Sequence, residues 1–206
     1  MFNRLNAIIK TSMKTGLIAI MIAWAMAGFS MAAYADPITD AENWFNQLKT
    51  LKGRFIQVSD DGSYAEGDIY LKRPYWSRFD YDDPLETVLI TTKIWLHVDE
   101  QDREKLTSYP ISETPLGILF NENVKLSLDG ITTTATTKDG IVRIELDKPT
   151  GDDAGLLVLE FTDKPFELRR WMIIDSAGAQ TIVTFQNVEK NIDVSQRLFV
   201  PNNYSQ

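Results

Sequence analysis

The chain has 206 residues, of which 21 are basic and 29 acidic, giving a formal net charge of −8. This acidity argues against nucleic-acid binding, because phosphate recognition needs clustered lysine and arginine. The chain has no cysteine, which excludes disulfides, thiolate nucleophiles and cysteine-bound zinc. A hydrophobic fraction of 44% is typical of a folded globular protein.

The first 35 residues have the pattern of a cleavable export signal. Three basic residues precede an apolar run of 14 residues (16–29), and the small-x-small sequence Ala-Tyr-Ala (33–35) stands immediately before Asp36. The apolar run is shorter than the roughly 20 residues that a membrane span needs, although an uncleaved anchor is the alternative interpretation. We therefore expect a signal peptide over 1–35 and one exported domain over 36–206. In a Gram-negative bacterium the domain would be periplasmic.

One amphipathic helix is expected at the start of this domain. Its apolar residues recur at steps of three and four and are Ile38, Ala41, Phe45 and Leu48. Thr39 and Glu42 fit a capping box at its start. We expect the helix to end near residues 51–53.

The hydrophobic period then changes from about 3.6 to 2, which indicates β-strands. The expected strands are 54–59, 63–73, 75–81, 86–91, 94–98, 104–108, 131–138, 141–146, 156–162, 166–174 and 180–188, with a further edge strand at 198–201. Short turns join most of them, and Asp139-Gly140 is the strongest hairpin signal. This spacing predicts an antiparallel meander, either a sandwich or a curved, partly closed barrel.

A second short helix interrupts the strands at residues 114–120. Thr114 is its expected N-cap and Pro115 its first helical position, and Leu116, Leu119 and Phe120 form one apolar stripe. Two apolar helices laid on one sheet face would give either a closed core or a lidded cavity. Composition favours the closed core but does not decide between the two.

Catalytic signals are weak throughout the chain. His97 lies inside a strand pattern, and no Gly-x-Ser-x-Gly sequence is present. Most carboxylates fall at expected turns, where solvation explains them, and the sequence has neither a calcium-loop spacing nor a glycine-rich phosphate loop. We therefore expect no enzyme, no metal and no cofactor; an exported hydrolase using Asp or Glu is a remaining alternative.

Several sequence motifs occur together over nearly the whole exported part. They are Phe55-x-Gln57, Gly67-Asp68-Ile69-Tyr70-Leu71-Lys72-Arg73-Pro74, Arg78-Phe79-Asp80-Tyr81, Thr114-Pro115-Leu116, Leu168-Arg169-Arg170-Trp171 and Phe199-x-Pro201. With this set the chain resembles the periplasmic outer-membrane lipoprotein carrier (LolA) family. The resemblance implies a mainly β fold with two or three short helices: an unclosed antiparallel barrel of about 11 strands with a helical lid over an apolar cavity.

The resemblance also implies a function and partners. The cavity would take the acyl chains of lipoproteins released by an inner-membrane ABC transporter. The carrier, a monomer, would deliver them to an outer-membrane receptor lipoprotein or to the outer membrane itself. A lipid- or lipoprotein-sensing module of the same fold is the alternative function.

The expected site combines strand and helix residues. The expected cavity residues are Ile69, Leu71, Phe79, Val88, Ile90, Trp95, Leu116, Leu119, Phe120, Phe45 and Leu48. The resemblance gives Arg73 the role of a latch that holds the lid closed, and the strand alternation independently points Arg73 inward. Ser77 stands at an inward position where the family usually has a larger apolar residue; this difference would either widen the pocket or weaken its contact with acyl chains.

Overall fold

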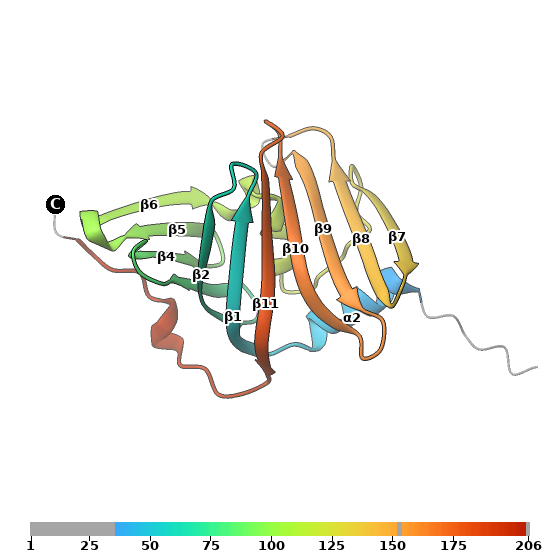
Figure 1. Ribbon diagram of the computed structural model, residues 1–206, viewed down its shortest axis with the longest axis horizontal. Helices are drawn as coiled ribbons and strands as arrows, with labels where there is room; N and C mark the ends of the chain where they lie inside the picture. Colours follow the sequence, from blue (N-terminus) through green and yellow to red (C-terminus); the bar gives the residue numbers. More distant parts are fainter. Residues whose placement is uncertain (1–35, 152–153, 205–206) are drawn as a thin grey trace, which may run out of the picture. The chain divides into compact units, whose positions relative to one another are not determined.

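The computed structural model describes residues 36–151 and 154–204 (Figure 1). The predicted signal peptide lies outside the described residues. All eleven strands of the described chain belong to one antiparallel sheet. They are β1 (Thr50–Ser59), β2 (Tyr64–Lys72), β3 (Trp76–Tyr81), β4 (Thr87–Thr91), β5 (Trp95–Glu100), β6 (Lys105–Pro110), β7 (Thr132–Lys138), β8 (Ile141–Lys148), β9 (Gly155–Thr162), β10 (Glu167–Asp175) and β11 (Gln180–Lys190).

The sheet is two meanders joined at its centre. Its order is β6-β5-β4-β3-β2-β1-β11-β10-β9-β8-β7, so the central pair, β1 and β11, is made of the first and last strands. The register places Leu51 opposite Lys190 and Ser59 opposite Thr181. The edge strands β6 and β7 do not pair with each other, so the sheet curls without closing. This confirms the expected unclosed antiparallel fold and excludes a sandwich.

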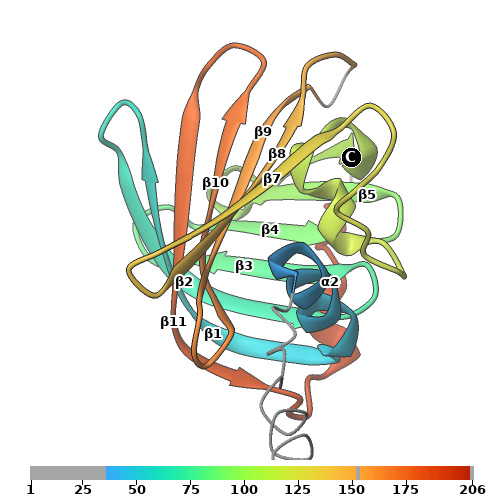
Figure 2. The ribbon, with the colours of Figure 1, turned by 90° about the vertical axis from the view of Figure 1, so that its right-hand side faces the viewer.

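The only α-helix of the described residues, α2 (Pro37–Gln47), lies on the inner side of the curled sheet (Figure 2). We call this side the concave face and the other the convex face. The expected capping box is wrong: Asp36 is the N-cap and accepts a hydrogen bond from the Ile38 amide, while Thr39 donates its hydroxyl proton to Asp36. The helix also ends earlier than expected, because Leu48 is already extended and β1 begins at Thr50.

Four short 3₁₀ helices complete the described chain: η1 (Gln101–Arg103), η2 (Ile111–Glu113), η3 (Pro115–Phe120) and η4 (Gln196–Phe199). The expected helix at 114–120 is present as η3, although it is a 3₁₀ helix. Thr114 precedes it without capping it, since its hydroxyl donates to the Ile111 carbonyl instead. We call η3 the lid.

The C-terminal segment packs on the convex face. The expected edge strand at 198–201 is wrong, because Leu198 and Phe199 belong to η4. Phe199 and Val194 form a small buried cluster with Val88 and Ile90 of β4. The segment therefore shields the convex side of β4 from water.

Side-chain hydrogen bonds fix this segment, residues 191–204, to the strands. Lys72 donates to the Val194 carbonyl at 2.9 Å, and Arg78 donates to the Leu198 carbonyl at 3.2 Å. Further along, the Tyr204 hydroxyl donates to Asp99 at 2.6 Å.

The main core fills the concave face beneath α2. Phe45 packs edge-on to Phe161, with ring centroids 6.1 Å apart. Asn46 fixes the helix to the loop after the lid, since its amide donates to the Val124 carbonyl at 3.0 Å and accepts from the Val124 amide at 2.8 Å. Glu42 accepts from the Leu126 amide at 2.8 Å. α2 and this loop therefore form one cover over the concave face.

Candidate functional site

A cavity of about 310 Å³ lies on the concave face under the lid. We call it the lid cavity. The sheet contributes Gln57, Ser77, Phe79, Tyr81, Leu89, Thr91, Leu96, Trp171, Ile173, Thr181 and Val183 to its wall, and the lid side contributes Ile111, Thr114, Pro115, Leu116 and Phe120. Its surface is mostly apolar, so a hydrocarbon ligand would lose water contacts on entering it.

Strand register determines which side chains face the lid cavity. Phe79 of β3 stands opposite Leu89 of β4, and Ser77 opposite Thr91. Residues paired across two strands share a face, so β4 turns Leu89 and Thr91 toward the cavity. The Phe79 ring, 8% exposed, makes an edge contact with Phe55 at a centroid distance of 5.2 Å.

Seven of the eleven expected cavity residues meet in one buried cluster: Phe45, Leu48, Ile69, Leu71, Phe79, Leu119 and Phe120. Leu116 packs against this cluster from the lid. Only Phe79, Leu116 and Phe120 of these eight line the lid cavity. The others lie toward α2, where the remaining void is only about 10 Å³. The concave face is therefore a packed core at the α2 end and a hollow under the lid.

Val88, Ile90 and Trp95 do not belong to the concave face. Val88 and Ile90 are buried on the convex face under Phe199. Trp95 of β5 is one residue before Leu96, which lines the lid cavity, so its side chain points to the opposite face, where it is 42% exposed. The expectation failed because Val88, Leu89 and Ile90 are all apolar, and alternation cannot indicate which face such a strand turns inward.

Other wall residues were not expected. Leu89, Leu96, Trp171, Ile173 and Val183 come from strands that the sequence predicts, but they are not among the expected cavity residues. The C-terminal half of the sheet therefore supplies one wall of the lid cavity, and only the register of β9–β11 reveals this.

Arg73 connects the end of β2 to the end of the lid. Its guanidinium donates hydrogen bonds to the carbonyls of Leu119, Asn121 (2.7 Å) and Glu122 (3.5 Å). Beside it, the Tyr75 amide donates to the Phe120 carbonyl at 3.0 Å. Burial lowers the pKa of Arg73 from its ordinary value, but an arginine keeps its charge in proteins. A charged donor thus satisfies carbonyls that a helix end leaves without internal partners.

The β2 residues before Arg73 make contacts on both faces of the sheet. At Gly67, a Cβ atom would lie 2.0 Å from the Asp80 carbonyl oxygen and 2.8 Å from the Phe55 ring, so only glycine fits. Ile69 is fully buried in the concave core. Lys72, on the convex side, holds the C-terminal segment as described above. This strand therefore couples the core, the lid and the C-terminal segment.

Two polar pairs lie in the wall of the lid cavity. Tyr81 donates a hydrogen bond to the Gln57 side-chain oxygen at 2.7 Å, and the hydroxyls of Ser77 and Thr91 are 2.8 Å apart. Burial raises the pKa of Tyr81 to about 12. The indole nitrogen of Trp171 is the one buried side-chain polar atom without a hydrogen-bond partner in the part of the chain that the structure describes. Its ring stands edge-on to Phe185 at 4.8 Å.

The single histidine of the chain lies away from the lid cavity. His97 stands opposite Ile90, a convex-face residue, and its Nδ1 is 2.8 Å from the Ser108 hydroxyl. Within residues 36–151 and 154–204, no group of three or more His, Asp or Glu side chains could hold a metal ion. The helices described in this range are too short or too polar to cross a membrane.

These features define an open-barrel protein: a curled antiparallel sheet, an apolar cavity and a lid held by a half-buried arginine. Residues 46–202 match the family model described as outer membrane lipoprotein carrier protein LolA, and the chain belongs to this family.

Curated relatives match it over nearly their full length. An outer-membrane lipoprotein carrier protein of Pseudomonas paraeruginosa is 28% identical over 199 residues, covering 89% of this chain and 94% of the relative. One from Methylobacillus flagellatus is 24% identical over 196 residues, covering 90% of each.

One solved structure shows the same type of fold. A DUF1329 family protein from Desulfovibrio piger superposes with a TM-score of 0.51 at 11% identity, covering 81% of this chain and 98% of that one. A putative outer membrane lipoprotein-sorting protein domain from Vibrio parahaemolyticus gives a TM-score of 0.49 at 6% identity, covering 79% and 94%.

Proposed function

We propose that this protein is a periplasmic carrier that holds the acyl chains of lipoproteins in the lid cavity and delivers them to the outer membrane. The observation that carries the proposal is an apolar cavity beneath a lid whose end is fastened by Arg73. The family, a lipoprotein carrier family, supports it. The proposal requires no chemical reaction at the site.

The energetics suit a carrier that must release its cargo. Burying hydrocarbon is worth about 0.8 kcal/mol per CH₂, so full burial of three long acyl chains would exceed the roughly 20 kcal/mol ceiling of noncovalent affinity. A volume of about 310 Å³ is at the small end of ligand sites. Larger cargo therefore requires the lid to move, which separates Leu119 and Phe120 from the core that they now fill. That cost offsets part of the gain from acyl burial and keeps binding reversible.

The proposed partners follow from this route. An inner-membrane ABC transporter would release the acylated lipoprotein to the carrier. A receptor lipoprotein of the outer membrane, or the outer membrane itself, would receive it. The carrier would act as a monomer without a cofactor.

The decisive experiment combines ligand identification with a matched pair of variants. Protein purified from the periplasm is analysed by mass spectrometry for copurifying lipids and lipoproteins, and then titrated with a fluorescent fatty-acyl probe. We expect acylated species to copurify and Leu116→Asp, in the cavity wall, to weaken probe binding strongly. Leu128→Asp is the control, because Leu128 is 44% exposed and does not line the lid cavity. Absence of both copurifying acyl groups and probe binding would refute the carrier function.

The proposed location has its own test. Export with cleavage after Ala35 predicts a mature protein that begins at Asp36. Intact-mass analysis of the periplasmic fraction measures this directly. A periplasmic protein that keeps residues 1–35 would contradict the predicted cleavage, and a protein found only in the cytoplasm would contradict the location.

A further inference from the structure

A second cavity, of about 550 Å³, adjoins the lid cavity. We call it the mouth pocket. It lies between the turn that joins β1 to β2 and the turn that joins β3 to β4. Its lining residues are Gln57, Ser63, Tyr64, Ala65, Glu66, Tyr81, Asp82, Asp83, Pro84, Leu85, Thr87 and Leu89.

The two cavities are adjacent and share part of their walls. Gln57, Tyr81 and Leu89 line both of them. The hydrogen bond from Tyr81 to Gln57 joins two of these shared residues, so this pair stands at the boundary. On the outer side, Tyr64 and Leu85 are 60% and 46% exposed, leaving large side chains in contact with water at the pocket edge. A ligand that passes the boundary pair would leave its outer end in the mouth pocket.

The mouth pocket differs from the lid cavity in charge. Its lining carries the three carboxylates of Glu66, Asp82 and Asp83 and no basic side chain. Arg54 pairs with Asp82 and also with Asp68, at 3.3 Å. The Glu66 carboxylate accepts a hydrogen bond from the neutral hydroxyl of Tyr64, at 3.0 Å, which leaves its charge in place, so the pocket keeps a net negative charge.

The same end of the sheet is acidic beyond the pocket. The turns at 60–63, 82–86 and 101–104 hold seven acidic residues and one basic residue. The turns at the opposite end of the same strands, 73–75 and 92–94, hold Arg73 and Lys93 and no acidic residue. Clustered charge of one sign raises the local concentration of oppositely charged ligands.

We propose that the mouth pocket binds the part of the cargo next to its acyl chains, namely the glyceryl-cysteine group and the first residues of the polypeptide, with preference for a cationic segment. The inference rests on the proposed function, since acyl chains in the lid cavity are covalently joined to this polar group. The polar group needs a continuous, partly polar compartment, because burial of unpaired polar atoms in the lid cavity would be costly. The mouth pocket provides that compartment and selects the charge of what enters it.

The test uses two synthetic diacylglyceryl-cysteine lipopeptides of equal length, one followed by lysines and one by glutamates. Each competes with a fluorescent fatty-acyl probe on periplasmic protein at low salt. We expect the lysine lipopeptide to bind about three to ten times more tightly, as a few partly exposed charge pairs permit. Added salt and the Glu66→Gln/Asp83→Asn double variant should both bring the ratio toward one.

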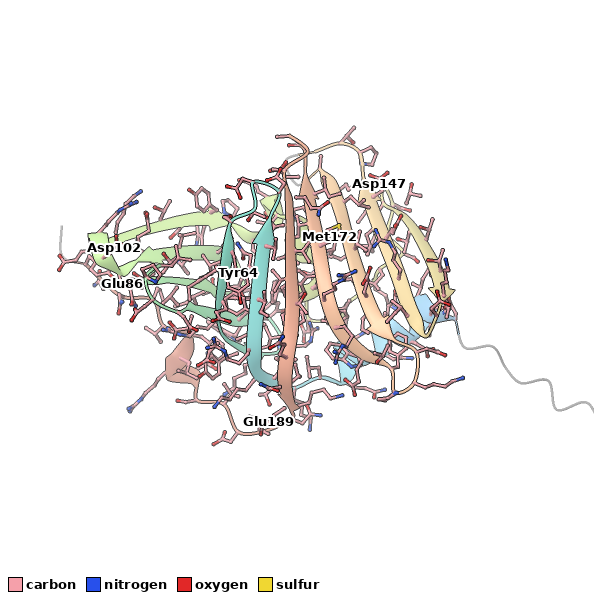
Figure 3. All side chains as sticks on the ribbon, viewed as in Figure 1. Tyr64, Glu86, Asp102, Asp147, Met172 and Glu189 are labelled. Carbon is pink, nitrogen blue, oxygen red and sulfur yellow. The ribbon has the colours of Figure 1, made fainter. Side chains whose placement is uncertain are left out.

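A matched control distinguishes the effect of carboxylates that line the mouth pocket from the effect of the other negative charges at this end of the sheet. Glu86 and Asp102 lie together at the same end of the sheet (Figure 3), but neither lines the mouth pocket. Glu86→Gln/Asp102→Asn removes the same number of charges and should leave most of the preference in place. Equal binding of the two lipopeptides to the unmodified protein, or equal loss in both double variants, would overturn the proposal. Binding of the fatty-acyl probe without any lipopeptide preference would refute the mouth pocket alone, whereas absence of all binding would refute the carrier function as well.

Discussion

Ser77 and Thr91 lie opposite each other on β3 and β4, with their hydroxyl oxygens 2.8 Å apart in the wall of the lid cavity. Thr91 gives its single hydroxyl proton to the Tyr75 carbonyl at 2.8 Å, so Ser77 must be the donor to Thr91. Both hydroxyls are satisfied within the protein. This part of the wall therefore needs no hydrogen-bond partner from a ligand, although two of its residues are polar.

Ser77→Leu should shorten the longest acyl chain that the protein accepts. The added side chain would occupy space in the lid cavity, where Ser77 is fully buried. The free energy of unfolding should fall by less than about 3 kcal/mol, because the neighbouring cavity relieves overpacking. Fluorescent acyl probes of increasing length measure the effect. Ser77→Ala is the control, and should lose about 1 kcal/mol of stability while accepting the same chains; an unchanged length limit in Ser77→Leu would contradict the assignment.

Phe79 and Phe199 offer a comparison between the two faces of the sheet. Phe199→Ala should destabilise the protein by about 3–5 kcal/mol and leave acyl binding intact, because Phe199 packs on the convex face. Phe79→Ala should cost less, since one side of its ring faces a cavity. Phe79→Glu should abolish acyl binding by placing a carboxylate where hydrocarbon enters. Thermal unfolding and probe titration on the same samples check all three. Loss of probe binding in Phe199→Ala at a temperature where it remains folded would contradict the assignment of faces.

Arg73→Leu should loosen the lid. The change removes hydrogen bonds from a charged donor, each worth about 1.5–3 kcal/mol, and leaves the carbonyls of Asn121 and Glu122 without that partner. Amide hydrogen exchange in residues 116–120 should accelerate, while exchange in β8 and β9 stays unchanged. The exchange rate of the lid in Arg73→Lys should lie between those of the unmodified protein and Arg73→Leu, because a single ammonium group cannot reproduce the planar fork of the guanidinium. Unaltered exchange in the lid of Arg73→Leu would show that this contact does not hold it.

Tyr81 should make the protein sensitive to alkali. Its pKa is about 12 in the folded protein, against an ordinary value near 10. Below pH 10 both the folded and the unfolded chain keep the proton. Between pH 10 and 12 only the unfolded chain releases it, so stability falls with rising pH by up to about 1.4 kcal/mol per unit. Denaturant unfolding at several pH values, with ultraviolet absorption of tyrosinate, measures this. Tyr81→Phe should lose the tyrosinate absorption step at high pH and should lose less stability between pH 10 and 12. An identical loss of stability in Tyr81→Phe and the unmodified protein would show that another group causes it.

The alternation of side chains predicts most of the sheet but not which strand face is inward. Where one face is polar, as with Asp68, Tyr70 and Lys72 on β2, the concave residues follow directly from the sequence. β4 has no polar face, because the C-terminal segment covers its convex side. That segment belongs to no recognisable strand or helix pattern, so neither its path nor its effect on β4 could be expected. The wrong assignment of Val88 and Ile90 therefore comes from burial by a distant segment, which local sequence preference does not show.

The site shows the same limit. Arg73 could be placed beside the lid because a strand pattern and a family motif agreed on its direction. The lid cavity itself depends on how β9–β11 curl toward Phe79, and this curvature has no local sequence signal. Trp171 is the clearest case, since an aromatic residue in a strand is compatible with a core or with a cavity wall.

The central pair of strands has a consequence for how the chain reaches its fold. β1 to β6 and β7 to β11 are each built from neighbouring hairpins, whose contacts close over short loops. The seam between β1 and β11 instead joins positions as distant in the chain as Leu51 and Lys190, and such long-range pairing is entropically slow. The two meanders can therefore form early, while the concave space exists only after the last strand has arrived. Until then β1 presents an unpaired edge, which is open to wrong partners. A chain truncated before Gln180 should consequently keep local hairpins but aggregate.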